Sequence, residues 1–80
     1  MNYNERIVID SEVRFGKPRI KGTRITVTDV FDYLSGGMSV DEFLLDFPQV
    51  KKDDILACFA FAADSGKRIA YGTDTPQNPA

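Results

Sequence analysis

The residues of this sequence best suited to bind a ligand are five cations in one short stretch. Between Val13 and Thr28 the chain has no Asp or Glu, and its cations there are Arg14, Lys17, Arg19, Lys21 and Arg24. Guanidinium and ammonium groups bind phosphates and carboxylates through charge-assisted hydrogen bonds. The stretch therefore predicts recognition of an anion, either nucleic-acid phosphate or an acidic protein surface. A third interpretation stays open, because exposed edge strands often carry Lys and Arg only to discourage aggregation.

Side chains for covalent catalysis are scarce. The chain has no histidine, and its one cysteine, Cys58, lies in the apolar run 55–63, where a thiol behaves as an inert hydrophobe. Asp53 and Asp54 could hold a metal, but acids are also expected where a helix begins, since the helix dipole favours negative charge there. The sequence has neither a phosphate-binding glycine loop nor a zinc-ligand set. It predicts a protein that is not an enzyme and needs no metal or cofactor.

The length of the chain and the distribution of its charges describe the protein that carries this basic stretch. Eighty residues make one small domain whose core supplies little stability, so support from a second copy is expected. The formal net charge is −2, but residues 1–28 carry six bases against three acids and residues 29–64 carry two bases against eight acids.

No apolar run approaches the roughly 18 residues of a membrane span, and the polar N-terminus lacks a signal-peptide core. With a single thiol, we expect a cytoplasmic protein.

The elements that position the cations follow from apolar spacing and from turn residues. A β-branched run at 6–9 predicts a short strand, and the glycines and proline beyond it predict an edge strand or loose hairpin. Gly22 indicates a positive φ or a close approach of another chain. Apolar residues at helical spacing then predict three helices. Their expected boundary residues are Thr26 with Asp29 and Gly36–Gly37 for the first, Ser39 with Glu42 and Pro48 for the second, and Ser65–Gly66 for the end of the third, which begins near Lys52.

The third helix is apolar on every side, which is typical of a helix buried all round. Two short helices can hardly surround it in a monomer, so the sequence predicts a homodimer that packs on Phe59 and Phe61. The fold class expected is mostly α, a three-helix, homeodomain-like helix-turn-helix bundle with a short N-terminal β strand or hairpin arm. The organisation expected is a basic β arm over 1–26, a three-helix domain over 27–66 and a flexible tail over 67–80, one domain overall.

Three stretches of the chain, "GKPRIKGTRITV", "GGMSVDEFLLDFP" and "DDILACFAFA", resemble the bacterial domain-of-unknown-function family 433. The matching signature residues are Pro18, Ile20, Gly22, Thr23, Arg24 and Ile25, followed by Gly37, Ser39, Glu42 and Pro48. Two departures stand out. Ser11 replaces a frequent proline, and Lys51–Lys52 replace a frequent Thr or Ser cap, which leaves Asp53 to cap the third helix. Members of the family are similar to homeodomain-like proteins, and some are regarded as VapB-type antitoxins paired with a PIN-like ribonuclease toxin.

This resemblance implies a non-catalytic antitoxin that binds and restrains a PIN-like ribonuclease and that could regulate its own operon by binding DNA. In this interpretation the short edge strand adds to the partner's sheet through main-chain hydrogen bonds, with Ile20 or Ile25 for specificity, while Arg24 and Arg19 reach its carboxylate-lined metal site. The alternative is a stand-alone DNA-binding regulator that uses the five cations on phosphates, and a third interpretation is a structural adaptor. Base reading by the third helix is not expected, because Asp53 and Asp54 occupy its start.

Overall fold

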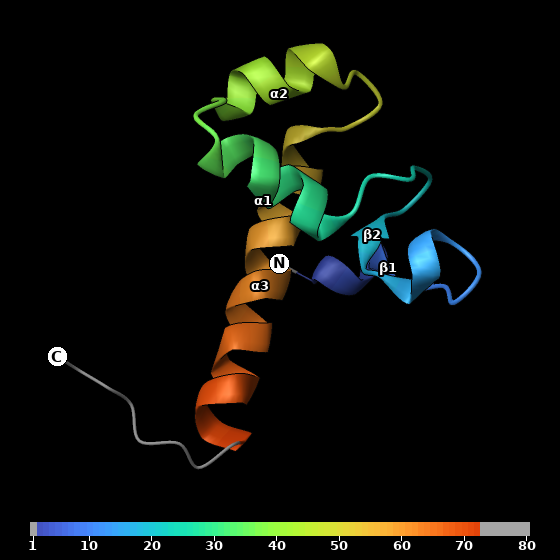
Figure 1. Ribbon diagram of the computed structural model, residues 1–80, viewed down its shortest axis with the longest axis vertical. Coiled ribbons are helices and arrows are strands. Elements are labelled where there is room, and N and C mark those ends of the chain that lie inside the picture. Colours follow the sequence, from blue (N-terminus) through green and yellow to red (C-terminus); the bar gives the residue numbers. More distant parts are fainter. Residues whose placement is uncertain (1, 73–80) are drawn as a thin grey trace, which may run out of the picture.

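The computed structural model describes residues 2–72, with side chains through residue 66. The elements in chain order are the short 3₁₀ helix η1 (Tyr3–Glu5), β1 (Ile7–Val8), the 3₁₀ turn η2 (Arg14–Gly16), β2 (Arg19–Ile20), α1 (Val27–Ser35), α2 (Val40–Asp46) and α3 (Lys52–Gly72). The strands pair antiparallel, with Ile7 opposite Ile20 and Val8 opposite Arg19. The three helices contact one another, and the hairpin lies to one side of them (Figure 1). This confirms the predicted small helical bundle with an N-terminal hairpin.

Helices α1 and α2 begin at the predicted capping boxes. Thr26 Oγ1 accepts a hydrogen bond from Asp29 N at 2.9 Å, and Asp29 Oδ2 accepts one from Thr26 N at 3.0 Å. Ser39 and Glu42 repeat the arrangement at 3.1 and 2.8 Å. Each box satisfies backbone N–H groups that a helix start leaves without intrahelical partners. These local patterns fix the direction in which each helix leaves the preceding loop.

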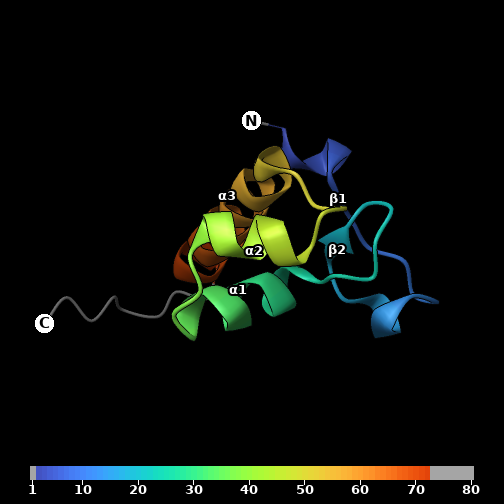
Figure 2. The ribbon, with the colours of Figure 1, turned by 90° about the horizontal axis from the view of Figure 1, so that it is seen from above.

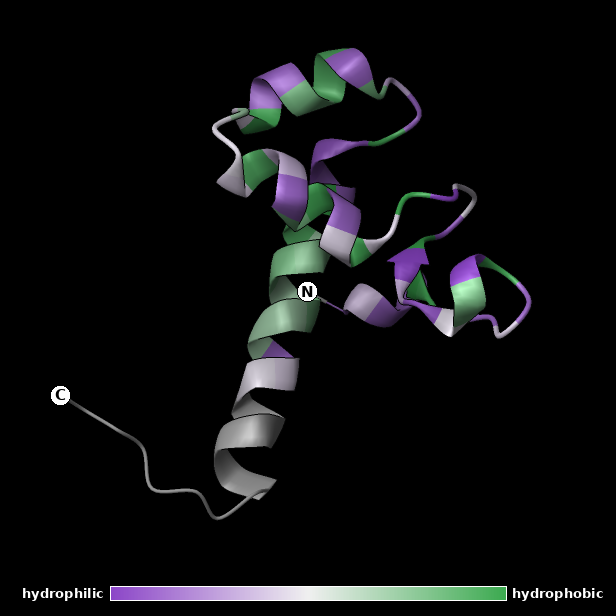
Figure 3. Ribbon diagram, viewed as in Figure 1, coloured by the Kyte–Doolittle hydropathy of each residue, from purple (hydrophilic) through white to green (hydrophobic). Residues whose placement is uncertain are grey.

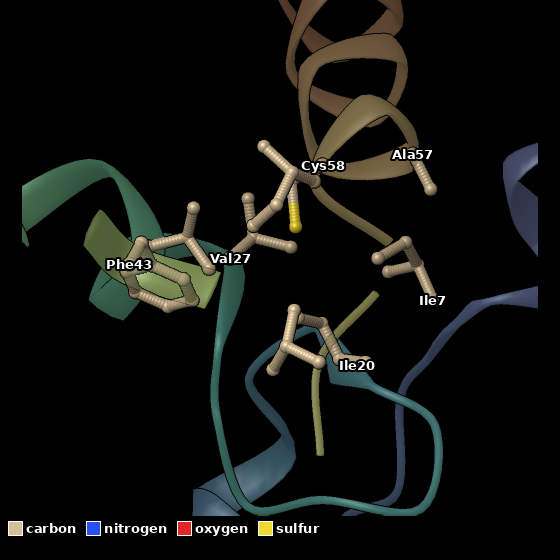
Figure 4. Packing of buried hydrophobic residues seen from close by; sticks show 9 residues of the cluster. Ile7, Ile20, Val27, Phe43, Ala57 and Cys58 are labelled. Atoms are coloured by element: carbon tan, nitrogen blue, oxygen red, sulfur yellow. The ribbon is translucent and has the colours of Figure 1, made fainter. Parts of the chain in front are cut away.

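The core lies where the hairpin meets the three helices. Figure 4 shows Ile7 and Ile20 of the strands facing Ala57 and Cys58 of α3, with Val27 and Phe43 completing the contact from α1 and α2. Cys58 is fully buried, and burial, followed by the nearby charge of Asp54, raises the pKa of its thiol to about 12. The thiol therefore packs as a small hydrophobic group, as predicted.

Helix α3 differs from the prediction at its end and in its burial. It does not end at Ser65–Gly66 but continues to Gly72, because adding residues to an existing helix costs far less than starting one and a single glycine is tolerated. Its distal half extends beyond the other elements (Figure 1). The predicted tail from residue 73 onward lies outside the described residues. The helix is also not buried all round, since Leu56 and Phe59 are 44% and 42% exposed while Ile55 and Cys58 are buried.

The start of α3 is held by Asp54 rather than by Asp53. Asp54 Oδ2 accepts a hydrogen bond from Lys51 N at 2.9 Å, and its Oδ1 accepts one from Arg6 Nη1 at 2.9 Å. Asp53 is exposed and lies 3.5 Å from Arg6 Nη2. A carboxylate at the third helical position reaches back to the cap backbone, as in a capping box, so Lys51 needs no capping side chain of its own. Asp54 thereby ties the N-terminal segment to the helix.

Figure 2 looks down on the bundle and shows the hairpin set apart from α1 and α2 on one side. Figure 3 shows an apolar stretch of α3 where the helix passes the other elements and hydrophilic residues in the turn that follows β2. The fold thus separates an apolar helix junction from a polar turn, which carries two of the predicted cations, Lys21 and Arg24.

Candidate functional site

The basic loop, residues 14–24, is the candidate site, but its cations do not act as one patch. Arg14 is occupied by the fold, because its Nη1 donates to Asp29 Oδ2 at 3.0 Å and to the backbone oxygen of Arg24 at 2.8 Å. Burial alone raises the pKa of Asp29, yet the hydrogen bonds from Thr26 and Arg14 outweigh it and hold that pKa below its ordinary value. Arg14 is therefore neutralised by an ionised partner and anchors the loop to the start of α1.

Arg19 is also used within the chain. Its Nη1 donates to the backbone oxygen of Thr23 at 3.0 Å, across the turn that follows β2. Its Nε is buried and has no hydrogen-bond partner among the described residues. The sequence interpretation had this guanidinium enter the active site of a partner. Because the group is held over its own turn, it is poorly placed to do so. Its evident role is to brace the turn.

The cations that remain free are Lys17, Lys21 and Arg24. All three are exposed, and in residues 2–66 none of their side chains forms a hydrogen bond or an ion pair. Of the five predicted binding residues, the structure thus leaves three with their charges directed to solvent. An anion that meets this loop would find these three charges rather than five.

The signature residues build the turn that carries Arg24. Gly22 has φ +81°, and Thr23 N donates to Ile20 O at 3.0 Å, as in a turn that requires positive φ at its third position. The Thr23 hydroxyl donates to Ile20 O at 2.8 Å and accepts from Ile25 N at 3.0 Å. Pro18 O accepts a hydrogen bond from Val27 N at 2.9 Å. The positive φ explains Gly22, and within its own chain the missing Cβ would have no heavy atom within 4 Å.

Strand β2 is not a free edge. Lys21 N donates to Arg6 O on one side, and Ile20 N donates to Ile25 O on the other, both at 2.8 Å. Ile20 is 1% exposed and belongs to the core, so the expectation that it contacts a partner is wrong. Ile25 is half-buried and packs against the core. Sheet extension by β2 with Ile20 as a specificity residue is therefore excluded by the fold itself.

A groove lies beside the Arg14–Asp29 ion pair, between the basic loop, α1 and the turn that precedes α3. Its volume is about 450 Å³, within the usual range of ligand pockets, although it is open to solvent. Besides the ion pair, it is lined by Arg24, Ile25, Tyr33, Phe47 and Gln49. The groove offers an aromatic wall and one free guanidinium at its rim. Sequence reasoning missed it, because Tyr33 and Phe47 lie in separate helical segments that only the fold brings together.

Phe15 is a further residue that sequence reasoning missed. Its side chain is 96% exposed, the most exposed of the large hydrophobic residues described, and its φ is +58°. An aromatic residue between Arg14 and Gly16, in a segment without helical or strand periodicity, is the only sequence signal for it. That signal does not predict its backbone conformation.

The two phenylalanines predicted to form an oligomer interface have different surroundings. Phe59 stacks on Phe31 with ring centroids 5.7 Å apart and remains 42% exposed. Phe61 is half-buried and meets the ring of Tyr3 edge-on at 5.4 Å. Phe61 is thus largely covered by its own chain. Phe59, with the neighbouring Leu56, presents the apolar surface of α3 to solvent.

The exposed start of α3 carries Lys51, Lys52 and Asp53, a mixed-sign surface that lacks the usual base-reading side chains. Within the described residues, no group of three or more Cys, Asp or Glu side chains is placed to hold a metal ion. None of the helices there is long and apolar enough to cross a bilayer.

Comparisons with known proteins match this chain to one family. The model of the family described as "Protein of unknown function (DUF433)" matches residues 7–62, which include the basic loop, α1, α2 and the first half of α3. The chain is also similar to a solved structure, the crystal structure of a DUF433 member protein from Anabaena variabilis. The two are 27% identical with a TM-score of 0.74, over 86% of this chain and 72% of that one. No curated protein matches this chain.

Proposed function

The chain belongs to the DUF433 family, and we propose that it is a non-catalytic, antitoxin-like protein that binds and restrains a PIN-like ribonuclease. The observation that carries the proposal is the free guanidinium of Arg24, exposed at the rim of an aromatic-walled groove. Arginine binds carboxylates in a bidentate manner, and a PIN-like nuclease holds its metal with carboxylates. An arginine placed among them competes with the metal electrostatically and blocks the nuclease.

The charge distribution supports this assignment of the basic loop. Arg14 and Arg19 are held within the fold, so Arg24, Lys17 and Lys21 carry the charge that a partner meets. The rest of the bundle is acidic, with eight acids against two bases over residues 29–64. An acidic partner is therefore attracted to the loop and repelled by the helices, which orients its approach.

Binding of DNA is the alternative function, and the same three free cations favour it. Each phosphate contact adds to the salt dependence of binding, so three cations would give a modest dependence. The acidic residues on the helices oppose a broad contact with a duplex. In this alternative the protein is a stand-alone regulator, or it binds DNA as part of the ribonuclease complex and regulates its own operon.

A second copy of the chain is the proposed partner of α3. Leu56 and Phe59 form an exposed apolar strip on that helix, and the chain is small enough to gain stability by covering it. Such a contact would be made by α3 and not by the hairpin that carries the basic loop, which lies to one side of the helices (Figure 1). A cytoplasmic location is part of the same proposal, since an intracellular ribonuclease would be the target.

The test is to co-express the tagged chain with each PIN-like ribonuclease of the source genome and to measure complex formation and RNA cleavage. We expect a stable complex in which cleavage is suppressed. Arg24→Ala should restore cleavage, whereas Lys21→Ala, which removes another exposed cation from the same turn, should not. Suppression that survives Arg24→Ala would reject the guanidinium as the blocking group, and failure to bind any of the ribonucleases would reject the proposed function.

A further inference from the structure

The tip of η2 has an unusual backbone. Arg14, Phe15 and Gly16 have φ values of +50°, +58° and +76°, so three successive residues are left-handed. Glycine adopts this conformation freely, but a bulky aromatic residue does so only at a cost in free energy. Such strain is usually found where a binding or catalytic function requires it.

Nothing within the described chain compensates for placing an aromatic residue there. The Phe15 side chain is 96% exposed and forms none of the ring contacts that join the other aromatic residues. It contributes almost no burial to the core. Asn or Gly would suit this backbone better, so the side chain is explained by something outside the chain.

The turn holds Phe15 in a defined position. Gly16 N donates to Val13 O at 3.1 Å, and Lys17 N donates to Arg14 O at 3.2 Å. The guanidinium of Arg14 fastens the turn to Asp29 at the start of α1. A side chain displayed on a fixed turn loses little freedom when it binds, and this increases affinity.

From these observations we infer that Phe15 is the anchor side chain of the partner-binding surface, and that the partner is a protein offering an apolar pocket rimmed by carboxylates. Aromatic residues in desolvated pockets dominate many protein interfaces. The charge requirement follows from two free cations. Lys17 lies two residues after Phe15, and the backbone oxygen of Arg24 accepts a hydrogen bond from Arg14 Nη1 at 2.8 Å, while the Arg14 charge is already paired with Asp29. A second copy of this chain is a poor occupant, since it would bring the same cations against these.

This inference rests on the proposed function, because it identifies the side chain that anchors the ribonuclease. The test compares the whole chain with Phe15→Asn, which suits a left-handed backbone, and with Leu45→Asn, a matched loss of an 81% exposed apolar side chain on α2. Affinity for the ribonuclease is measured by calorimetry, and stability by urea unfolding. We expect Phe15→Asn to bind at least about tenfold more weakly while unfolding at the same or a higher urea concentration. Leu45→Asn should bind as the parent does.

Other outcomes separate the two proposals. If the parent binds the ribonuclease and Phe15→Asn binds equally well, the anchor is wrong while the proposed function stands. If the parent binds none of the ribonucleases, both are rejected. Phe15-dependent binding to duplex DNA or to phosphatidylserine vesicles, without ribonuclease binding, would also overturn the inference, because the aromatic side chain would then be a wedge between bases or a membrane contact.

Discussion

Arg6 and Asp54 lie 48 residues apart in the sequence and meet at the junction of the N-terminal segment with α3, where Arg6 Nη1 donates to Asp54 Oδ1 at 2.9 Å. Asp54 is 8% exposed, and its other oxygen accepts from the backbone of Lys51. The pair therefore joins the segment that precedes β1 to the helix on which the core is built. It holds in place the strand that hydrogen-bonds to β2 and, through β2, the basic loop.

Removal of Arg6 should destabilise the whole domain. Arg6→Ala leaves a largely buried carboxylate without its charged partner, and we expect the free energy of unfolding to fall by about 1–3 kcal/mol. Urea unfolding followed by circular dichroism measures it. Arg24→Ala is the matched control, since it removes an exposed, unpaired arginine and should change stability by less than about 0.5 kcal/mol. Equal effects of the two substitutions would contradict the role given to Asp54.

Stability should decline in acid because of the two capping boxes. Hydrogen bonds from Ser39 hold the pKa of Glu42 below its ordinary 4.5, and Asp29 is likewise held below 3.8. Both groups have lower pKa values folded than unfolded, so their contribution is present above the unfolded pKa values and is lost as the pH falls through the folded ones. Unfolding measured between about pH 6 and pH 2 should show this loss. Asp29→Asn and Glu42→Gln should make the decline shallower, and an unchanged slope would contradict the assignment.

Cys58 should be unreactive in the folded protein. Burial raises the pKa of its thiol from 9.0 to about 12, which lowers the thiolate fraction at neutral pH roughly a thousandfold, since each pKa unit is a factor of ten. A disulfide reagent should label it slowly under native conditions and rapidly in denaturant. Rapid labelling of the native chain, at a rate unaffected by stabilising conditions, would show that the thiol is accessible.

Much of this fold follows from local sequence patterns, and those parts were predictable. The caps at Thr26 and Ser39 involve residues three positions apart, and the positive φ of Gly22 belongs to a single turn. The apolar periodicity likewise located α1 and α2. The residues that make each of these interactions lie within a few positions of one another, so their pattern can be recognised in the sequence.

The features that decide the candidate site are not local. The carboxylate that neutralises Arg14 is 15 residues away, and the groove joins Tyr33 of α1 to Phe47 beyond α2. The sequence therefore indicated five cations available for binding, where the fold leaves three free. The end of α3 was misplaced for a different reason, since Ser65 and Gly66 weaken a helix without stopping one that is already formed.

Two glycines provide a test of backbone conformation alone. Gly22 and Gly66 each have open space where a Cβ would be added, but Gly22 has φ +81° and Gly66 lies within α3. Gly22→Ala should therefore destabilise the chain by about 1 kcal/mol or more, whereas Gly66→Ala should stabilise it by about 0.5–1 kcal/mol. Thermal unfolding of the two variants measures the difference. A stabilising Gly22→Ala would mean that the turn does not need its left-handed residue.

Self-association should depend on Phe59 and not on Phe61. Phe59 is 42% exposed beside Leu56, so Phe59→Ala removes apolar surface from the proposed dimer contact. We expect light scattering at micromolar concentration to show a dimer for the parent and a shift toward monomer for this variant. Phe61 packs on Tyr3, so Phe61→Ala should lower the free energy of unfolding by about 2–4 kcal/mol where the cavity it leaves does not collapse. The same substitution should affect the dimer contact less than Phe59→Ala does. A Phe59→Ala variant that stays dimeric would place the interface elsewhere. A parent chain that is monomeric at this concentration would reject the proposed dimer.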